Sequence, residues 1–108
     1  MKKITNLTPH EVTLVDDNGN IIATFPPSGI VARVSVKTIR VATINNIPIS
    51  ASSFGEVENL PEPNDEEVFI VSSLVAQRCK HRKDVFIPNE SVRDDKGRII
   101  GCRSLGII

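Results

Sequence analysis

Apolar and polar residues alternate along several short stretches of this chain with the two-residue period of β-strands. The alternation is clear in residues 11–15 and 20–25. Between them lies Asp-Asp-Asn-Gly, which favours a tight turn because Asn18 and Gly19 tolerate positive φ. These signals predict a first β-hairpin over residues 11–25.

A second alternating stretch covers residues 30–44, after a break at Pro26 and Pro27, which have no N–H to donate to a strand ladder. One predicted face is apolar and the other carries Arg33 and Lys37. Residues 45–50 predict a turn followed by a short strand. Residues 56–67 hold six acidic side chains and no basic one, which indicates an exposed loop.

The continuous apolar run in residues 67–73 is typical of a strand buried on both faces. It leads into one short predicted helix near 73–81, capped by Ser72 or Ser73 and with basic residues in its last turn. Residues 84–88 predict another strand, and residues 91–104 a second hairpin. That hairpin repeats the D-D-x-G-x-I-I of the first, which we attribute to shared turn chemistry rather than to duplication.

Together these elements predict a β-rich α+β fold. We expect an antiparallel or mixed sheet of six to nine short strands with one short helix, in a single domain over residues 1–108.

Composition narrows the choice of partners. The chain has no net charge, four Phe, no Trp and no Tyr, so we expect neither duplex nucleic acid nor stacked single strands as ligands. No apolar window is long enough for a membrane span, and we expect MKKITNLTPH (1–10) not to be a signal peptide, because no apolar run follows its two lysines. Cys79 and Cys102 are expected to be free thiols in a reducing cytoplasm.

The sequence contains no phosphate-binding loop, no dinucleotide fingerprint, no nucleophile elbow and no metal-ligand spacing. We therefore expect no metal, no cofactor and no enzyme activity. A phosphodiesterase using His10 and His81 as base and acid remains an alternative, although nothing in the sequence brings the two together.

Anion binding is the chemistry that the residues favour most. At the end of the buried strand, Ser72 and Ser73 open the predicted helix, where N–H groups and hydroxyls suit a phosphate. Arg78 lies one to two turns further on and could bind the phosphate with two nitrogens. The competing interpretation is ordinary helix capping by serine. The neighbouring cations Lys80, Arg82 and Lys83 are explained by the helix dipole and by solvent.

Three more residues are candidates for the same site. Arg33 and Arg103 lie within strand-like segments, where a guanidinium needs either water or a partner. They either face solvent or, together with Arg93 and Arg98, surround a pocket for a phosphorylated molecule. His10, which precedes a strand, either is exposed or lines a ligand site, and Phe25 or Phe54 could cover a base.

Over nearly its whole length, the chain resembles a family of small proteins encoded by bacteriophages and prophages. The resemblance lies in NLTPHEV (6–12), PPSG (26–29), VARV (31–34), GEVENLPEP (55–63), VSSLVAQ (71–77), RKDVFIP (82–88) and VRDDKGRIIGCRSL (92–105). It implies an accessory protein in the bacterial host cytoplasm and transfers no active site. In its small size, its lack of catalytic motifs and its arginines, the chain is also similar to phage anti-defence proteins that sequester nucleotide immune signals.

The leading hypothesis is a non-enzymatic homo-oligomer that binds an anionic nucleotide signal, such as a cyclic oligonucleotide or an ADP-ribose derivative, and withholds it from host defence. The predicted ligand-binding residues are Ser72, Ser73, Arg78, Arg33, Arg103 and His10. The alternative is a protein-interaction module, a virion or assembly component or an inhibitor of a host protein, with residues 56–67 as its contact surface.

Overall fold

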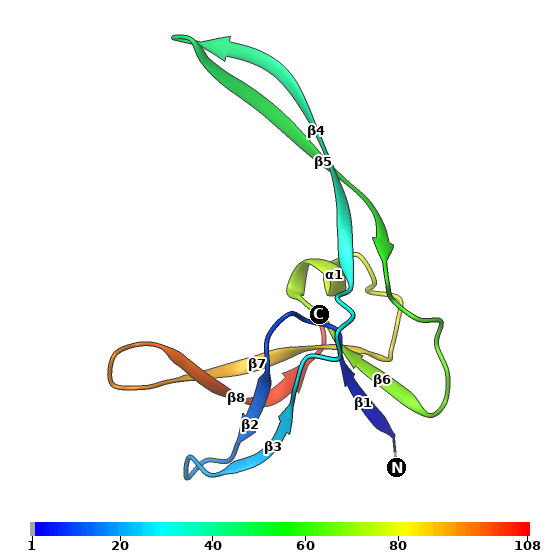
Figure 1. Ribbon diagram of the computed structural model, residues 1–108, viewed down its shortest axis with the longest axis vertical. Helices are drawn as coiled ribbons and strands as arrows, with labels where there is room; N and C mark the ends of the chain where they lie inside the picture. The colour runs from blue at the N-terminus through cyan, green and yellow to red at the C-terminus, as the bar shows by residue number, and fades with distance from the viewer. Residues whose placement is uncertain (1) are drawn as a thin grey trace.

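The computed structural model describes residues 2–108, which form eight strands and one helix (Figure 1). In chain order these are β1 (Lys3–Asn6), β2 (Val12–Val15), β3 (Ile21–Phe25), β4 (Arg33–Ile44), β5 (Ile47–Glu58), β6 (Glu67–Ile70), α1 (Ser73–Gln77), β7 (Val85–Arg93) and β8 (Ile99–Gly106). The prediction of a β-rich chain with one short helix is confirmed. The strands divide between two sheets, and two of them are 12 residues long rather than short.

The body of the molecule is a six-stranded mixed sheet with the order β1-β6-β7-β8-β2-β3. β6 pairs in parallel with β1 and β7, and β8 pairs antiparallel with β7 and parallel with β2. Both predicted hairpins are present, as β2–β3 and as β7–β8. The second is longer than predicted because β7 extends from Val85 to Arg93.

β6 and the residue after it lie at the centre of the core. Phe69, Ile70 and Val71 have no exposed surface. Phe69 and Val71 pack in a cluster with α1 and the base of β4, whereas Ile70 packs in a second cluster with Val12, Leu14 and Cys102. Because neighbouring strand residues point to opposite faces, the sheet is covered on both sides here. This confirms the predicted strand buried on both faces.

The helix is shorter than the predicted 73–81. α1 ends at Gln77, after five residues, and the chain continues through turns in which Arg82 N–H bonds to the Cys79 carbonyl. The cations at 80, 82 and 83 therefore lie beyond the helix, and its last turn holds no basic residue. The helix dipole does not explain them, because its effect is confined to the last turn.

The second sheet is a two-stranded hairpin, here called the arm, formed by β4 and β5 (residues 33–58). Figure 1 shows it projecting away from the body. The sequence predicted only a short strand after the turn at 45–50, yet β5 continues to Glu58. The acidic stretch 56–67 therefore begins inside a strand. The serines at 50, 52 and 53 have weak strand propensity, and pairing with β4 holds them extended.

Two asparagines make the turn at the tip of the arm. Asn45 and Asn46 have φ of 51° and 64°, the left-handed values that a two-residue hairpin turn requires. The arm makes the molecule elongated: its radius of gyration is 17.1 Å, against about 13 Å for a compact chain of this length.

Candidate ligand-binding site

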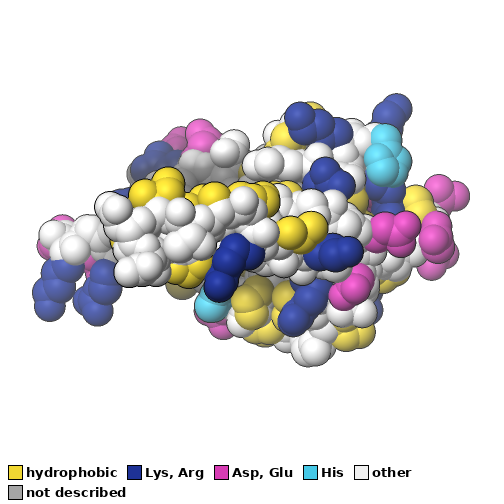
Figure 2. All heavy atoms as spheres, turned by 90° about the horizontal axis from the view of Figure 1, so that it is seen from above, with side chains coloured by type: hydrophobic (Ala, Val, Ile, Leu, Met, Phe, Trp, Pro, Cys, Tyr) yellow, Lys and Arg dark blue, Asp and Glu magenta, His cyan; other side chains and the backbone are white. Residues whose placement is uncertain are grey.

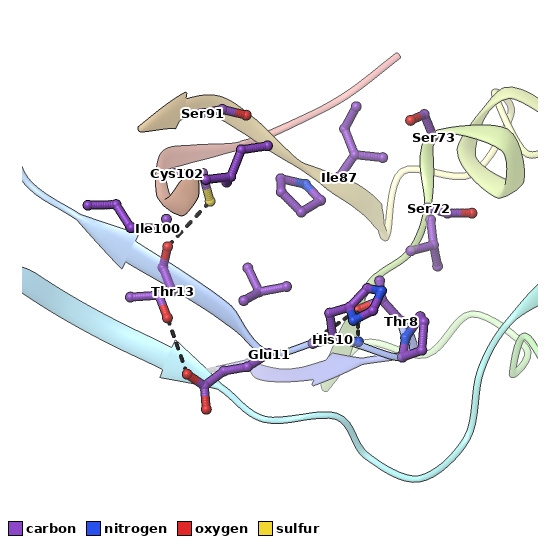
Figure 3. A pocket seen from close by; sticks show the side chains of 16 residues that line it. Thr8, His10, Glu11, Thr13, Ser72, Ser73, Ile87, Ser91, Ile100 and Cys102 are labelled. Carbon is purple, nitrogen blue, oxygen red and sulfur yellow. Dashed lines mark hydrogen bonds between the residues drawn. The ribbon is translucent and has the colours of Figure 1, made fainter. Parts of the chain in front are cut away.

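A cavity of about 690 Å³ lies between the loop at 8–13, the segment 71–73 and the β7–β8 hairpin. Figure 3 shows His10 and Ser72 on one side of it and Ser91 and Cys102 on the other. The segments that line this pocket are far apart in the sequence and meet because β8 pairs with both β2 and β7. The sheet order therefore creates the pocket.

Three of the six predicted ligand-binding residues line this pocket, namely His10, Ser72 and Ser73. The structure does not bring Arg33, Arg78 or Arg103 to it. Among the described lining residues there is no Lys or Arg, and Glu11 is the one carboxylate. The Glu11 carboxylate lies 3.5 Å from the Thr13 hydroxyl.

A buried polar network positions His10. The Asn6 side chain is 2% exposed, and its amide nitrogen donates to the carbonyl oxygens of His10 at 2.7 Å and Phe25 at 2.9 Å. Its side-chain oxygen accepts from the Thr8 N–H at 2.9 Å, and the Thr8 hydroxyl lies 2.7 Å from the same oxygen. These bonds fix the backbone from residue 6 to residue 10, so the loop presents His10 at the pocket.

Asn6 and Thr8 position His10, and the sequence analysis assigned no site role to either residue. The signal that could have found them is the short run Asn-Leu-Thr-Pro-His. In it, Asn6 and Thr8, whose side chains readily bond nearby backbone groups, flank the buried Leu7 in the sequence.

Ser72 caps α1, as the competing interpretation of this residue expected. Its Oγ accepts a hydrogen bond from the Val75 N–H at 3.4 Å, while the residue stays exposed at the pocket. Ser73 is the first residue of the helix and is also exposed. A helix of five residues has a weak dipole, so any attraction for an anion must come from hydroxyls and N–H groups.

The remaining wall of the pocket is largely apolar. It is formed by side chains of β2, β7 and β8, among them Val12, Ile87, Ile100 and Cys102. The Cys102 thiol lies 3.6 Å from the Thr13 carbonyl oxygen, and burial raises its pKa above the ordinary value. A neutral thiol adds to the apolar surface.

The three predicted arginines have other contacts. Arg78 donates from Nη2 to the carbonyl oxygens of Phe54 at 3.2 Å and Gly55 at 3.5 Å, which ties the end of α1 to the arm. Arg103 forms an exposed ion pair of 3.0 Å with Asp17. Arg33 is the exposed first residue of β4, opposite Glu58 on β5.

Arg82 is mostly buried and bonds other parts of the chain, so it is not the solvated cation that the sequence predicted. It pairs with Asp84 at 2.7 Å, with both side chains only 13% exposed, and also donates to the Pro61 carbonyl oxygen at 2.9 Å. The hydrogen bond from Arg82 holds the pKa of Asp84 below its ordinary value. The pair joins the turn after α1 to the start of β7 and to the loop that follows the arm.

A second hollow of about 680 Å³ lies at the base of the arm and is lined by His81, Arg78, Arg82 and two glutamates. His81 thus lines a different hollow from His10. The two histidines proposed for a phosphodiesterase are not brought together in the described part of the chain.

Residues 2–108 contain no cluster of three or more His, Cys, Asp or Glu side chains placed to hold a metal ion. Within the same residues, no helix has the length and apolar character needed to cross a membrane. No protein-family model, no curated protein and no solved structure matches this chain.

Proposed function

We propose that this protein binds a small anionic nucleotide-derived signal in the pocket between β2, α1 and the β7–β8 hairpin, and withholds it without changing it chemically. The observation that carries the proposal is the convergence of His10, Ser72 and Ser73 on one cavity of about 690 Å³. That volume lies within the usual range of small-molecule sites.

The chemistry of the lining supports a nucleotide. A base or ribose needs apolar walls, which Val12, Ile87 and Ile100 supply. A phosphate needs hydrogen-bond donors, and Ser72, Ser73 and His10 are among the lining residues whose side chains can donate. With no Lys or Arg among the described lining residues, binding would rest on shape and hydrogen bonds more than on net charge.

The resemblance to small bacteriophage proteins supplies the biological setting of the proposal. A protein that withholds a nucleotide signal in the cytoplasm of a bacterial host would block antiphage defence. Sequestration requires tight binding and a sufficient quantity of protein, and it requires no catalytic group. We therefore propose an anti-defence role without an enzymatic step.

Thermal unfolding with a panel of ligands tests the proposal. The probes are cyclic dinucleotides, cyclic trinucleotides, ADP-ribose and cyclic ADP-ribose. A ligand present at a hundred times its dissociation constant stabilises the fold by about 2.7 kcal/mol, which raises the Tm of a domain of this size by roughly 10 °C. We expect such a shift with at least one probe. No shift with any of them would contradict the proposal.

Two substitutions locate the binding site. We expect Ile100→Arg, which places a bulky charged side chain in the pocket, and His10→Ala each to reduce the Tm shift by more than half. His81→Ala is the matched control, because His81 lines the other hollow, and it should leave the shift unchanged. A shift that survives Ile100→Arg would place the ligand elsewhere.

The second candidate function is a protein-interaction module, and one observation favours it. Residues 56–67 carry six carboxylates and no basic side chain, and most of them are exposed. Co-purification of a host protein that is lost when these acids are changed to Asn and Gln would support this function. Retention of the nucleotide-induced Tm shift in the same variant would show that the acidic stretch is not the nucleotide site.

A further inference from the structure

The backbone of His10 is held on both sides, while its side chain is left free. The His10 carbonyl oxygen accepts from Asn6 Nδ2 at 2.7 Å and from the Thr8 hydroxyl at 2.9 Å, and the His10 N–H lies 3.4 Å from the same hydroxyl oxygen. Within residues 2–108, the imidazole itself makes no hydrogen bond and no ion pair. The loop therefore presents an exposed ring at the pocket, with both ring nitrogens available to a ligand (Figure 3).

His10 is also the one described lining residue whose side chain can gain a positive charge. Neither Lys nor Arg is among the described residues that line the pocket. The helix α1 has only five residues, so its first turn adds little positive potential. An anion in this pocket therefore has a full positive charge beside it only when the imidazole is protonated.

The groups around His10 leave it as the one that changes charge near neutral pH. On the same loop lies Glu11, and carboxylates titrate well below imidazoles. On β8 the titratable group is Cys102, and burial raises the pKa of its thiol above the ordinary value. The described lining residues from β2, from β7 and from residues 71–73 include no titratable side chain.

We propose that this pocket is a proton-coupled oxyanion site, in which His10 takes up a proton when a phosphate or sulfate group binds. A neutral imidazole has one N–H donor, whereas the protonated ring has two and carries a charge. The inference rests on the proposed function, because it assigns the anionic group of the proposed ligand to this pocket. It adds a regulation to that function: the protein holds its ligand more tightly as the solution becomes mildly acidic.

The strength of the coupling follows from the change in the hydrogen bond. A hydrogen bond from a charged donor is roughly twice as strong as one between neutral groups. We therefore expect the affinity for the anion to increase about fivefold to tenfold between about pH 8 and about pH 5.5, the range in which imidazoles titrate. Because coupling between two bound species is reciprocal, the anion also favours uptake of the proton.

Inorganic sulfate is a suitable probe, because its charge does not change across this range. Amide NMR spectra are recorded at increasing sulfate and constant ionic strength, at about pH 5.5 and about pH 8. We expect the amides of the pocket residues Thr13 and Gly101 to shift along a saturating curve. The dissociation constant should be about fivefold to tenfold smaller at the lower pH.

Two substitutions of His10 separate its charge from its shape. His10→Lys keeps a positive charge at both pH values, so its affinity for sulfate should hardly change with pH. His10→Gln keeps a donor without a charge, so it should bind sulfate weakly at both. His81→Ala is the matched control, because His81 lines the other hollow, and it should keep the pH dependence of the wild type.

Three results would overturn the inference. They are an equal affinity for sulfate at the two pH values, a pH dependence that persists in His10→Gln, and the absence of any sulfate-induced shift at the pocket. Each is distinct from a failure of the proposed function, which the nucleotide panel measures. A protein that binds a nucleotide and shows no pH-dependent sulfate binding would keep the function and lose the inference. The expected sulfate binding without any nucleotide binding would support the inference and contradict the function.

Discussion

The buried amide of Asn6 determines where His10 lies. It bonds the carbonyl oxygens of His10 and Phe25 and accepts from Thr8, so one side chain joins the pocket loop to β3. Removing it takes a hydrogen bond from each of these groups, although the Thr8 hydroxyl still donates to the His10 carbonyl oxygen at 2.9 Å; a buried group left without a partner costs about 1–3 kcal/mol.

We expect Asn6→Ala to lower the free energy of unfolding by at least about 2 kcal/mol and to weaken ligand binding in parallel with His10→Ala. Urea denaturation measures the first effect and the ligand-induced Tm shift the second. Asn20→Ala is the control, because its side chain is exposed and makes one long bond of 3.4 Å. A loss in Asn6→Ala no larger than in Asn20→Ala would contradict the role of this network.

The two thiols provide a second prediction at the scale of residues. Burial raises the pKa of Cys79 and of Cys102 above the ordinary value, which leaves little reactive thiolate at neutral pH. We expect neither thiol to react with Ellman's reagent in the native protein, and both to react after unfolding in urea. Rapid native reaction of either thiol would show that the core opens around it.

At the scale of elements, the two hairpin turns of the body are built alike. Asp16 Oδ1 accepts from the N–H groups of Asn18 and Asn20, and Asp94 Oδ1 accepts from those of Lys96 and Arg98. Gly19 and Gly97 have φ of 83° and 79°. The repeated Asp-Asp-x-Gly is therefore explained by this turn alone, as the sequence analysis inferred.

Positive φ at Gly97 gives a direct test of that turn. We expect Gly97→Ala to lower stability by about 1–2 kcal/mol, because Cβ disfavours the left-handed region, while open space surrounds the position. Gly97→Asn should lose clearly less, since Asn tolerates this conformation. Equal losses in the two variants would mean that another property of glycine matters here. Chemical denaturation of the two variants measures the difference.

The Arg82–Asp84 pair gives a prediction for pH. The folded-state pKa of Asp84 lies below the ordinary value of 3.8, so the pair stabilises the fold above that pH. This stabilisation disappears as pH falls through the lower folded-state pKa. We expect Asp84→Asn to be less stable than wild type at neutral pH, with the difference narrowing below about pH 4. A difference that stays constant from neutral to acidic pH, measured by urea denaturation, would contradict this role.

The parts of the fold that local patterns encode could be predicted. The hairpins at 11–25 and 91–104 follow from alternation and turn residues, and the strand at 67–73 follows from an apolar run. The arm could not be predicted in full, because Ser50, Ser52 and Ser53 carry no strand signal and are held extended by pairing with β4. The predicted helix end at residue 81 was wrong, because the chain leaves the helix after Gln77 and continues through turns toward β7.

The candidate site was predictable only in part for a related reason. His10, Ser72 and Ser73 stand next to strands, which is where the sequence placed them, and the sheet order brings them together. Sequence patterns say which side chains suit a phosphate but not which side chains face each other. Arg78 and Arg103 were predicted to bind the ligand because of their charge. In the structure, Arg78 donates to the carbonyl oxygens of Phe54 and Gly55, and Arg103 donates to Asp17.

At the scale of the whole molecule, the radius of gyration of 17.1 Å reflects an arm whose residues 36–56 are exposed (Figure 2). We expect the amides of residues 36–53 to exchange with deuterium much faster than those of β6, because the arm has few buried contacts of its own. Exchange of the arm as slow as that of β6 would contradict this expectation.

A pocket that holds a nucleotide signal and leaves it intact should release that molecule unchanged when the protein is denatured. The most direct measurement is mass spectrometry of the small molecules released on denaturation, after the protein has been purified from bacteria that produce nucleotide immune signals. We expect a stoichiometric, chemically unaltered cyclic oligonucleotide or ADP-ribose derivative from the wild-type protein and none from Ile100→Arg. Release of no nucleotide, or of a hydrolysed one, would contradict the claim.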